Sequence, residues 1–238
     1  MDERIFRVPQ VCIYCGGEVV TREHCPSRAL LDKPYSENIP TVPSCKLCNE
    51  GFSLDEEYLA CFIDCVISGS TNPTKVQREK VSKILERKPT MAKRIEASKQ
   101  EDEKGNLTWT PESKRIEEII LKLARGHVAV ELSAVVPEEP DDLYFMPLIA
   151  MSKEWYEEFE RAGAGEIAPW PGELGSRAFL RAAGQIPFGI QDGPWVIIQE
   201  GRYRYSLHEG GSVQVSMVLS EYLACQVYWE EYGQIDFN

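Results

Sequence analysis

The sequence lacks any long hydrophobic run. No stretch approaches the roughly 18 apolar residues that a membrane-spanning helix requires. The N-terminus, MDERIFRVPQ, mixes both charge signs and has no apolar segment of the kind found in secretory signals. No internal repeat or low-complexity tract is present, and 43% hydrophobic with 27% charged residues excludes a disordered or fibrous chain. We therefore expect a soluble, cytoplasmic protein with one large domain or two modest ones.

Positive charge is also scarce, since the net charge is −12, which argues against a protein that simply coats nucleic acid. The charge is unevenly distributed, however. Residues 75–125 carry 14 basic and 9 acidic residues, whereas residues 126–238 carry 6 and 18. This pattern indicates a locally attractive surface on an otherwise repulsive body. The plainer alternative is a solvated helix face rich in lysine.

Cysteine, by contrast, is present and clustered. Five of the eight cysteines fall between residues 12 and 48, and four of these form two CxxC pairs, Cys12/Cys15 and Cys45/Cys48. In a reducing compartment such pairs indicate metal ligands rather than disulfides. Four thiolates suit a tetrahedral structural zinc ion. A thioredoxin-like redox motif is the alternative, but no βαβ pattern surrounds either pair.

The spacing between the two pairs is informative. Zinc ribbons separate their CxxC pairs by about 15–20 residues, whereas residues 16–44 intervene here. More than a simple hairpin therefore lies between the pairs, and this segment contains Glu23-His24.

The segments CIYC, TREHCP and PSCKLCNEGFS together resemble an HNH endonuclease of the four-cysteine, ββα-metal type. The resemblance covers residues 10–57, about a fifth of the chain. It implies that a structural zinc ion holds a β-hairpin against a helix. An acidic residue and a histidine follow the first pair of cysteines, and an asparagine follows the second.

The resemblance also implies roles for individual residues. His24 would be the general base that deprotonates the attacking water, which suits an imidazole with a pKa near neutrality. Glu23 and Asn49 would bind a catalytic divalent cation such as Mg²⁺. Asn38 would orient His24, although Thr41 fits that spacing equally well.

Some residues depart from the family pattern or have simpler explanations. Ser53 stands where many members have a further ligand, and DKPYSEN replaces the usual basic loop. Asn49 is also a residue type that caps helices. Cys25 is a fifth cysteine near the zinc ligands, and Cys61 with Cys65 lies on one helix face; we expect all three to be buried rather than metal-bound.

The remaining sequence predicts an α+β chain. A helix is expected from a Ser53/Glu56 capping box to Gly69. Amphipathic helices follow over 74–104, with a break near Pro89, and another helix runs from Pro111 to about Arg125. We expect His127 to lie at the end of that helix, after a glycine stop.

Short β-branched and aromatic segments beyond residue 126 predict a mostly antiparallel sheet, with one helix around 153–161. The segments are HVAVEL, LYFMPLIAM, PWVIIQ, RYRYSL and SVQVSMVL. In RYRYSL, Tyr203 and Tyr205 alternate with arginines, which predicts core packing on one face, with base stacking as the alternative. The expected domains are a zinc-bound module (1–70), a basic helical segment (71–125) and an acidic α+β domain (126–238).

These observations favour a metal-dependent endonuclease that acts on DNA, or alternatively RNA, with the C-terminal part used for targeting or a protein partner. A small nuclease module on a larger domain is also consistent with a bacterial defence protein. The alternative is a non-catalytic, zinc-stabilised interaction module on a degenerate HNH scaffold. A third possibility is an acidic partner-binding protein whose C-terminal sheet carries the function.

Overall fold

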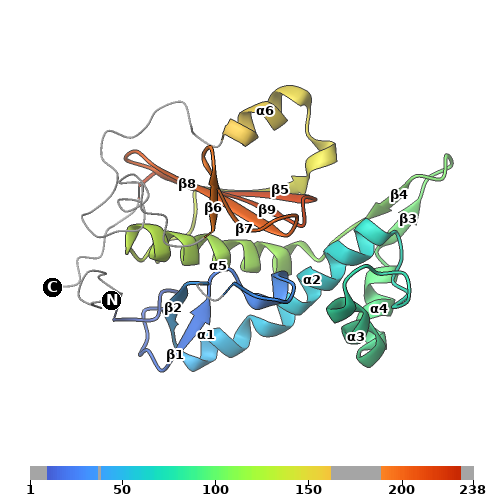
Figure 1. Cartoon of the computed structure of the whole chain (residues 1–238), viewed down its shortest axis with the longest axis horizontal. Helices are drawn as coiled ribbons and strands as arrows, with labels where there is room; N and C mark the ends of the chain where they lie inside the picture. The colour runs from blue at the N-terminus through green and yellow to red at the C-terminus, as the bar shows by residue number, and fades with distance from the viewer. Residues whose placement is uncertain (1–9, 37–38, 162–188, 232–238) are drawn as a thin grey trace. The chain divides into compact units, whose positions relative to one another are not determined.

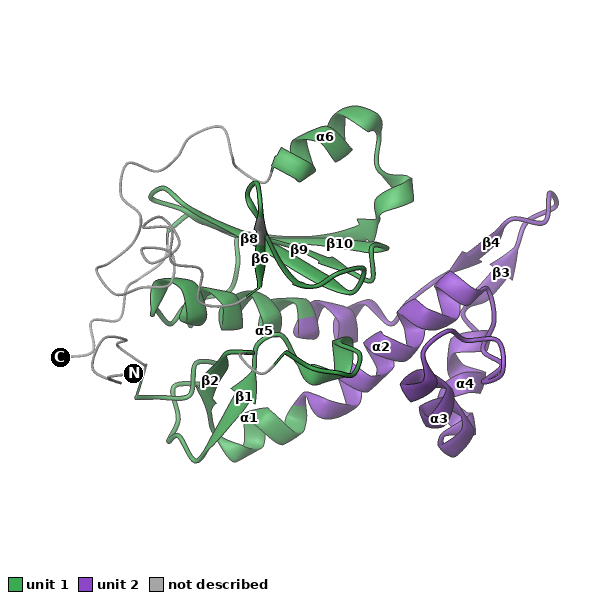
Figure 2. Cartoon of the chain, viewed as in Figure 1, with its two compact units in different colours: residues 1–51, 120–238 green, residues 52–119 purple. Residues whose placement is uncertain are grey.

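A computed structural model describes residues 10–36, 39–161 and 189–231 (Figure 1). The chain divides into two compact units, one formed by residues 1–51 with 120–238 and the other by residues 52–119 (Figure 2). Unit 2 is therefore an insertion in the sequence of unit 1. Across the described residues, no helix combines the length and the apolar character that a membrane span needs.

Unit 1 begins with a small hairpin. Strand β1 (Thr21–His24) pairs antiparallel with β2 (Thr41–Ser44), and Glu23 is opposite Val42 in the register. A short 3-10 helix, η2 (Arg28–Leu30), follows β1, and helix α1 (Lys46–Gly51) follows β2 directly. Two strands and a short helix therefore follow one another along this segment.

Helix α5 (Ser113–Leu132) forms the centre of unit 1 from residue 120 onward. Its side chains contact both the hairpin and the large sheet. Lys122 pairs with Glu23 of β1, and His127 lies 2.7 Å from the Tyr203 hydroxyl of the sheet. Figure 1 shows this helix running between the hairpin and the sheet.

The large sheet has six antiparallel strands in the order β5-β10-β9-β8-β7-β6. Its side chains alternate between two faces, as the pleat requires. Tyr203, Tyr205 and Met217 are fully buried on the face toward α5. The strands are β5 (Asp142–Pro147), β6 (Ile190–Asp192), β7 (Trp195–Gln199), β8 (Tyr203–Glu209), β9 (Val213–Leu219) and β10 (Leu223–Trp229).

The opposite face of this sheet is covered by helix α6 (Lys153–Arg161), which follows the 3-10 helix η3 (Leu148–Ala150). Phe159 packs on Trp195 with ring centroids 5.4 Å apart. Arg204 donates two hydrogen bonds to the Glu160 carboxylate, at 2.8 and 2.7 Å, and lies 4.4 Å above the Trp195 ring. The Arg204–Glu160 ion pair and the Phe159–Trp195 contact therefore hold α6 on the sheet.

Unit 2 consists of three helices, the N-terminal part of α5 and a two-stranded hairpin. Helix α2 ends at Gly69, whose φ of 62° is the left-handed conformation that glycine adopts readily. The elements that lie wholly in unit 2 are α2 (Ser53–Ser68), α3 (Glu79–Arg87), α4 (Pro89–Glu96), β3 (Lys99–Glu101) and β4 (Leu107–Trp109).

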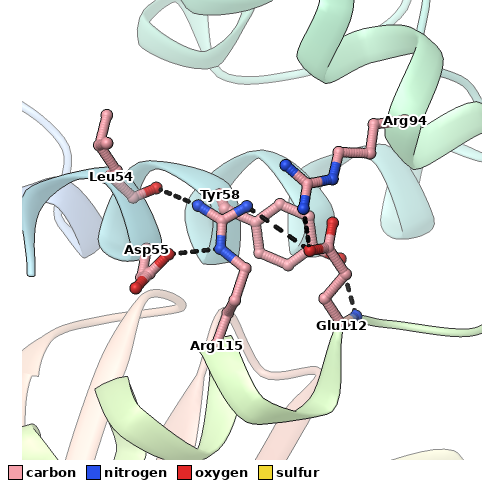
Figure 3. A network of polar contacts seen from close by, with 6 residues as sticks. All are labelled: Leu54, Asp55, Tyr58, Arg94, Glu112 and Arg115. Carbon is pink, nitrogen blue, oxygen red and sulfur yellow. Dashed lines mark hydrogen bonds and ion pairs between the residues drawn. The ribbon is translucent and has the colours of Figure 1, made fainter.

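A polar network joins α2 to the start of α5 in unit 2 (Figure 3). Arg115 donates hydrogen bonds to the Asp55 carboxylate and, at 2.9 Å, to the Leu54 carbonyl, and its guanidinium lies 4.4 Å above the Tyr58 ring. The Tyr58 hydroxyl in turn accepts the backbone N–H of Glu112 at 3.0 Å. The network therefore provides hydrogen-bond partners for the Glu112 N–H, just before α5, and for the Leu54 carbonyl of α2.

Several sequence predictions are confirmed by these elements. Helix α2 ends at the expected glycine, the basic segment breaks before Pro89, a helix occupies 153–161, and the three strand segments after residue 194 form β7, β8 and β9. Tyr203 and Tyr205 are buried, as core packing requires.

Others are wrong. HVAVEL is not a strand, because α5 continues through Gly126 to Leu132. His127 consequently lies inside the helix rather than at its end. The Ser53 capping box does not form, since Phe52 is the N-cap of α2 and has no side-chain cap. The hairpin of β3 and β4 was not expected from the sequence either.

Candidate functional site

The four cysteines of the two CxxC pairs converge on one point. The Sγ atoms of Cys12, Cys15, Cys45 and Cys48 all lie within 4.8 Å of one another. Cys15 and Cys45, which belong to different pairs, are 3.7 Å apart. A tetrahedron with Zn–S bonds near 2.3 Å has sulfur–sulfur edges of about 3.8 Å. The cluster therefore fits one metal ion such as zinc, and it is the sole candidate metal group among the described residues.

The protonation of these thiols also fits a metal centre. Burial opposes ionisation of Cys12, but backbone hydrogen bonds at Cys45, Tyr14 and Cys15 outweigh it and lower its pKa to about 7. Burial, followed by hydrogen bonding to Cys45 and Cys15, raises the pKa of Cys48. Thiols packed this closely cannot all ionise without a cation, and a bound metal supplies that charge.

Helix α1 follows the second cysteine pair and lies against β1. The side-chain amide of Asn49, which follows Cys48, donates a hydrogen bond to the Thr21 hydroxyl at 3.0 Å. Thr21 lies on the same face of β1 as Glu23, because alternate residues of a strand share a face. Asn49 and Glu23 are thus directed to one side of the hairpin.

On that side, Glu23 already has a cationic partner. The Nζ atom of Lys122 lies 3.4 Å from Glu23 Oε1, and the two side chains are 2% and 10% exposed. This is a buried ion pair, in which each charge depends on the other for solvation.

His24 lies on the other face of β1. It is half-buried, and burial, assisted by the positive charge of Arg28, lowers the pKa of its imidazole below the usual value. This shift favours the neutral imidazole, which is the form that a general base requires. Arg22, on the same face, is exposed, as is Arg28.

The two residues proposed to orient His24 have different outcomes. Asn38 lies outside the described residues. Thr41 is directly opposite His24 in the β1–β2 register. Its hydroxyl and carbonyl accept hydrogen bonds from Arg22 at 2.7 and 2.8 Å. Thr41 therefore fixes the guanidinium that shares a face with His24.

Comparison of the chain with known protein families, curated proteins and solved structures found no match.

A divalent cation at Glu23 and Asn49 does not fit the arrangement of these residues. The Glu23 carboxylate is paired with an ammonium group, and the Asn49 amide nitrogen is directed at Thr21. A cation placed beside Glu23 would be repelled by the ammonium group of Lys122.

The residues of α5 that support the hairpin were not predicted from the sequence. Cys25 Sγ lies 3.7 Å from Nδ1 of His127, whose ring stacks on Tyr205 at a centroid distance of 3.7 Å. The Tyr205 hydroxyl donates to the carboxylate of Glu131. This buried chain of side chains links β1 to the sheet across α5, and only the HVAVEL segment, read with helical periodicity, could have indicated it.

The basic segment is less available than its composition indicates. In unit 2, Lys83, Lys88, Arg94, Lys99 and Arg115 each pair with a carboxylate. Five of the basic side chains thus serve the unit's own structure. Cys61 and Cys65 are fully buried, as expected, and burial raises the pKa of each to about 12.

Proposed function

We propose that unit 1 hydrolyses phosphodiester bonds in nucleic acid, DNA before RNA, with His24 as the general base and the four cysteines holding a structural zinc ion. The protein would then be an endonuclease of the HNH type that the motifs resemble. The observation that carries this proposal is the half-buried imidazole of His24 at the end of β1, with Arg22 and Arg28 exposed beside it.

The arrangement suits the chemistry of the reaction. Hydrolysis needs a base to take a proton from water and positive charge to stabilise the phosphorane-like transition state. The lowered pKa of His24 provides the base, and guanidinium groups bind phosphate oxygens in a two-pronged geometry. Zinc would act here only as a scaffold, because four thiolates leave it no open position.

The test uses the purified, zinc-loaded full chain. We expect it to nick supercoiled plasmid or cleave a labelled single-stranded DNA or RNA, and we expect His24→Ala to lower the rate by about 10²- to 10⁴-fold. His208→Ala, which removes a histidine of strand β8 instead, should cleave at the wild-type rate. Equal cleavage by the His24 and His208 variants would show that a contaminant is responsible.

A second function is favoured by one specific observation, the burial of Glu23 against Lys122. In a non-catalytic, zinc-stabilised interaction module, the acidic residue of the nuclease scaffold would serve the core instead of the reaction. Glu23 is buried in this way. Absence of cleavage by a zinc-loaded, folded wild-type protein on all three substrates would favour this module over the enzyme.

A further inference from the structure

Lys122 pairs with Glu23, one of the two residues to which the resemblance assigns a divalent cation. Its ammonium is 3.4 Å from the Glu23 carboxylate, on the face of β1 to which α1 brings Asn49. We propose that Lys122 is a built-in cation that replaces the divalent metal ion beside Glu23 and keeps one from binding. This inference rests on the proposed function for its meaning, but its test does not depend on cleavage.

The segment of α5 that carries Lys122 is held in place by its packing. One helical turn beyond Lys122 is Gly126, where a Cβ atom would lie only 2.7 Å from Cys25 Sγ. The next residue, His127, is completely buried and lies 2.7 Å from the Tyr203 hydroxyl. The helix therefore cannot rotate or slide to withdraw Lys122 without separating these contacts.

The electrostatics favour exclusion of a metal ion. Lys122 is 2% exposed, so little water screens its charge from an incoming cation. Displacing the lysine would leave its ammonium buried without the carboxylate, and Glu23 would have to give up its ion-pair partner to become a ligand. A carboxylate already neutralised in this way is a poor ligand for Mg²⁺, which also dehydrates reluctantly.

The experiment is a titration with Mn²⁺, used as a spectroscopic substitute for Mg²⁺, followed by electron paramagnetic resonance of the free ion in zinc-loaded full chain. We expect wild-type protein to bind Mn²⁺ only weakly. Lys122→Met, which keeps the length of the side chain, should bind one Mn²⁺ per chain with an affinity raised roughly tenfold or more. Glu23→Gln/Lys122→Met should lose this gain.

Lys46→Met is the matched control, because Lys46 is exposed on α1 and pairs with Glu50 at 3.8 Å. It should behave like wild type. The proposal is overturned if wild type binds Mn²⁺ stoichiometrically and Glu23→Gln abolishes that binding, a result that needs no folded Lys122 variant. It is equally overturned if folded, zinc-loaded Lys122→Met binds no more tightly than wild type.

The two proposals can fail separately. If no protein cleaves nucleic acid but the Mn²⁺ pattern is as expected, the nuclease function is wrong and Lys122 still occupies the cation position. If cleavage depends on His24 and wild type binds Mn²⁺ through Glu23, the nuclease stands and the role of Lys122 is wrong.

Discussion

Replacing Gly126 with alanine tests how closely α5 approaches the hairpin. A Cβ atom at this position would lie 2.7 Å from Cys25 Sγ and 3.5 Å from Cys25 Cβ. Contacts below 3.0 Å are too short for a carbon and a sulfur atom, so one of the two elements must move. The sulfur cannot turn away without leaving the His127 imidazole, which is 3.7 Å from it.

Two opposing effects set the magnitude. Alanine in a helix interior is favoured over glycine by about 0.5–1 kcal/mol, which would stabilise α5. Inserting a methyl group into a closely packed core costs about 1–3 kcal/mol. We therefore expect Gly126→Ala to lower the free energy of unfolding by about 1–2 kcal/mol, despite its better helix propensity.

The measurement is urea unfolding of the zinc-loaded protein, monitored by tryptophan fluorescence. Gly51→Ala is the matched control, because Gly51 ends α1 and no atom lies within 4 Å of a Cβ there. It should change stability by less than about 1 kcal/mol. Removing the sulfur in Cys25→Ala/Gly126→Ala should recover about 1–2 kcal/mol relative to the sum of the single variants.

A stable Gly126→Ala protein, or strict additivity with Cys25→Ala, would refute this account of the packing. In either case α5 would not be fixed against β1 by this contact, and the position of Lys122 would need another explanation.

Three further predictions concern the metal centre and each unit. Cys45→Ser should lower the zinc content measured by a colorimetric chelator from one ion per chain, whereas Cys61→Ala should retain the ion, because its thiol lies outside the cluster. Arg204→Met should lower the free energy of unfolding, measured by thermal denaturation, by about 2–3 kcal/mol, because it removes the cationic partner of the Glu160 carboxylate on α6. The exposed Lys153→Met should lower it by about 0.5 kcal/mol or less. Arg115→Met should increase amide hydrogen exchange at the start of α2 and α5 in unit 2, whereas unchanged protection would show that the network of Figure 3 is dispensable.

The sequence predicted the parts of the fold that depend on local signals. The CxxC spacing predicted one four-thiolate cluster, because ligand chemistry leaves few other uses for paired cysteines in a reducing compartment. Gly69 and Pro89 marked real helix boundaries, since each changes what the backbone can do at its own position. Alternating Tyr and Arg in β8 likewise predicted which face is buried.

What the sequence could not predict depends on distant partners. Gly126 was interpreted as a helix stop, but it permits a close approach to Cys25, a hundred residues earlier in the chain. HVAVEL has strong β propensity, yet it is helical because its buried residues fit between the hairpin and the sheet. The pairing of Glu23 with Lys122 also could not be predicted, because nothing near Glu23 in sequence indicated that Lys122 would lie beside it.

The insertion of unit 2 into unit 1 has a consequence for the newly made chain. All four cysteines are synthesised by residue 48, but Lys122 follows 74 residues later. At roughly 5–20 residues per second this delay is on the order of 4–15 s. During that interval all four cysteines are available to a metal ion, before Lys122 can pair with Glu23.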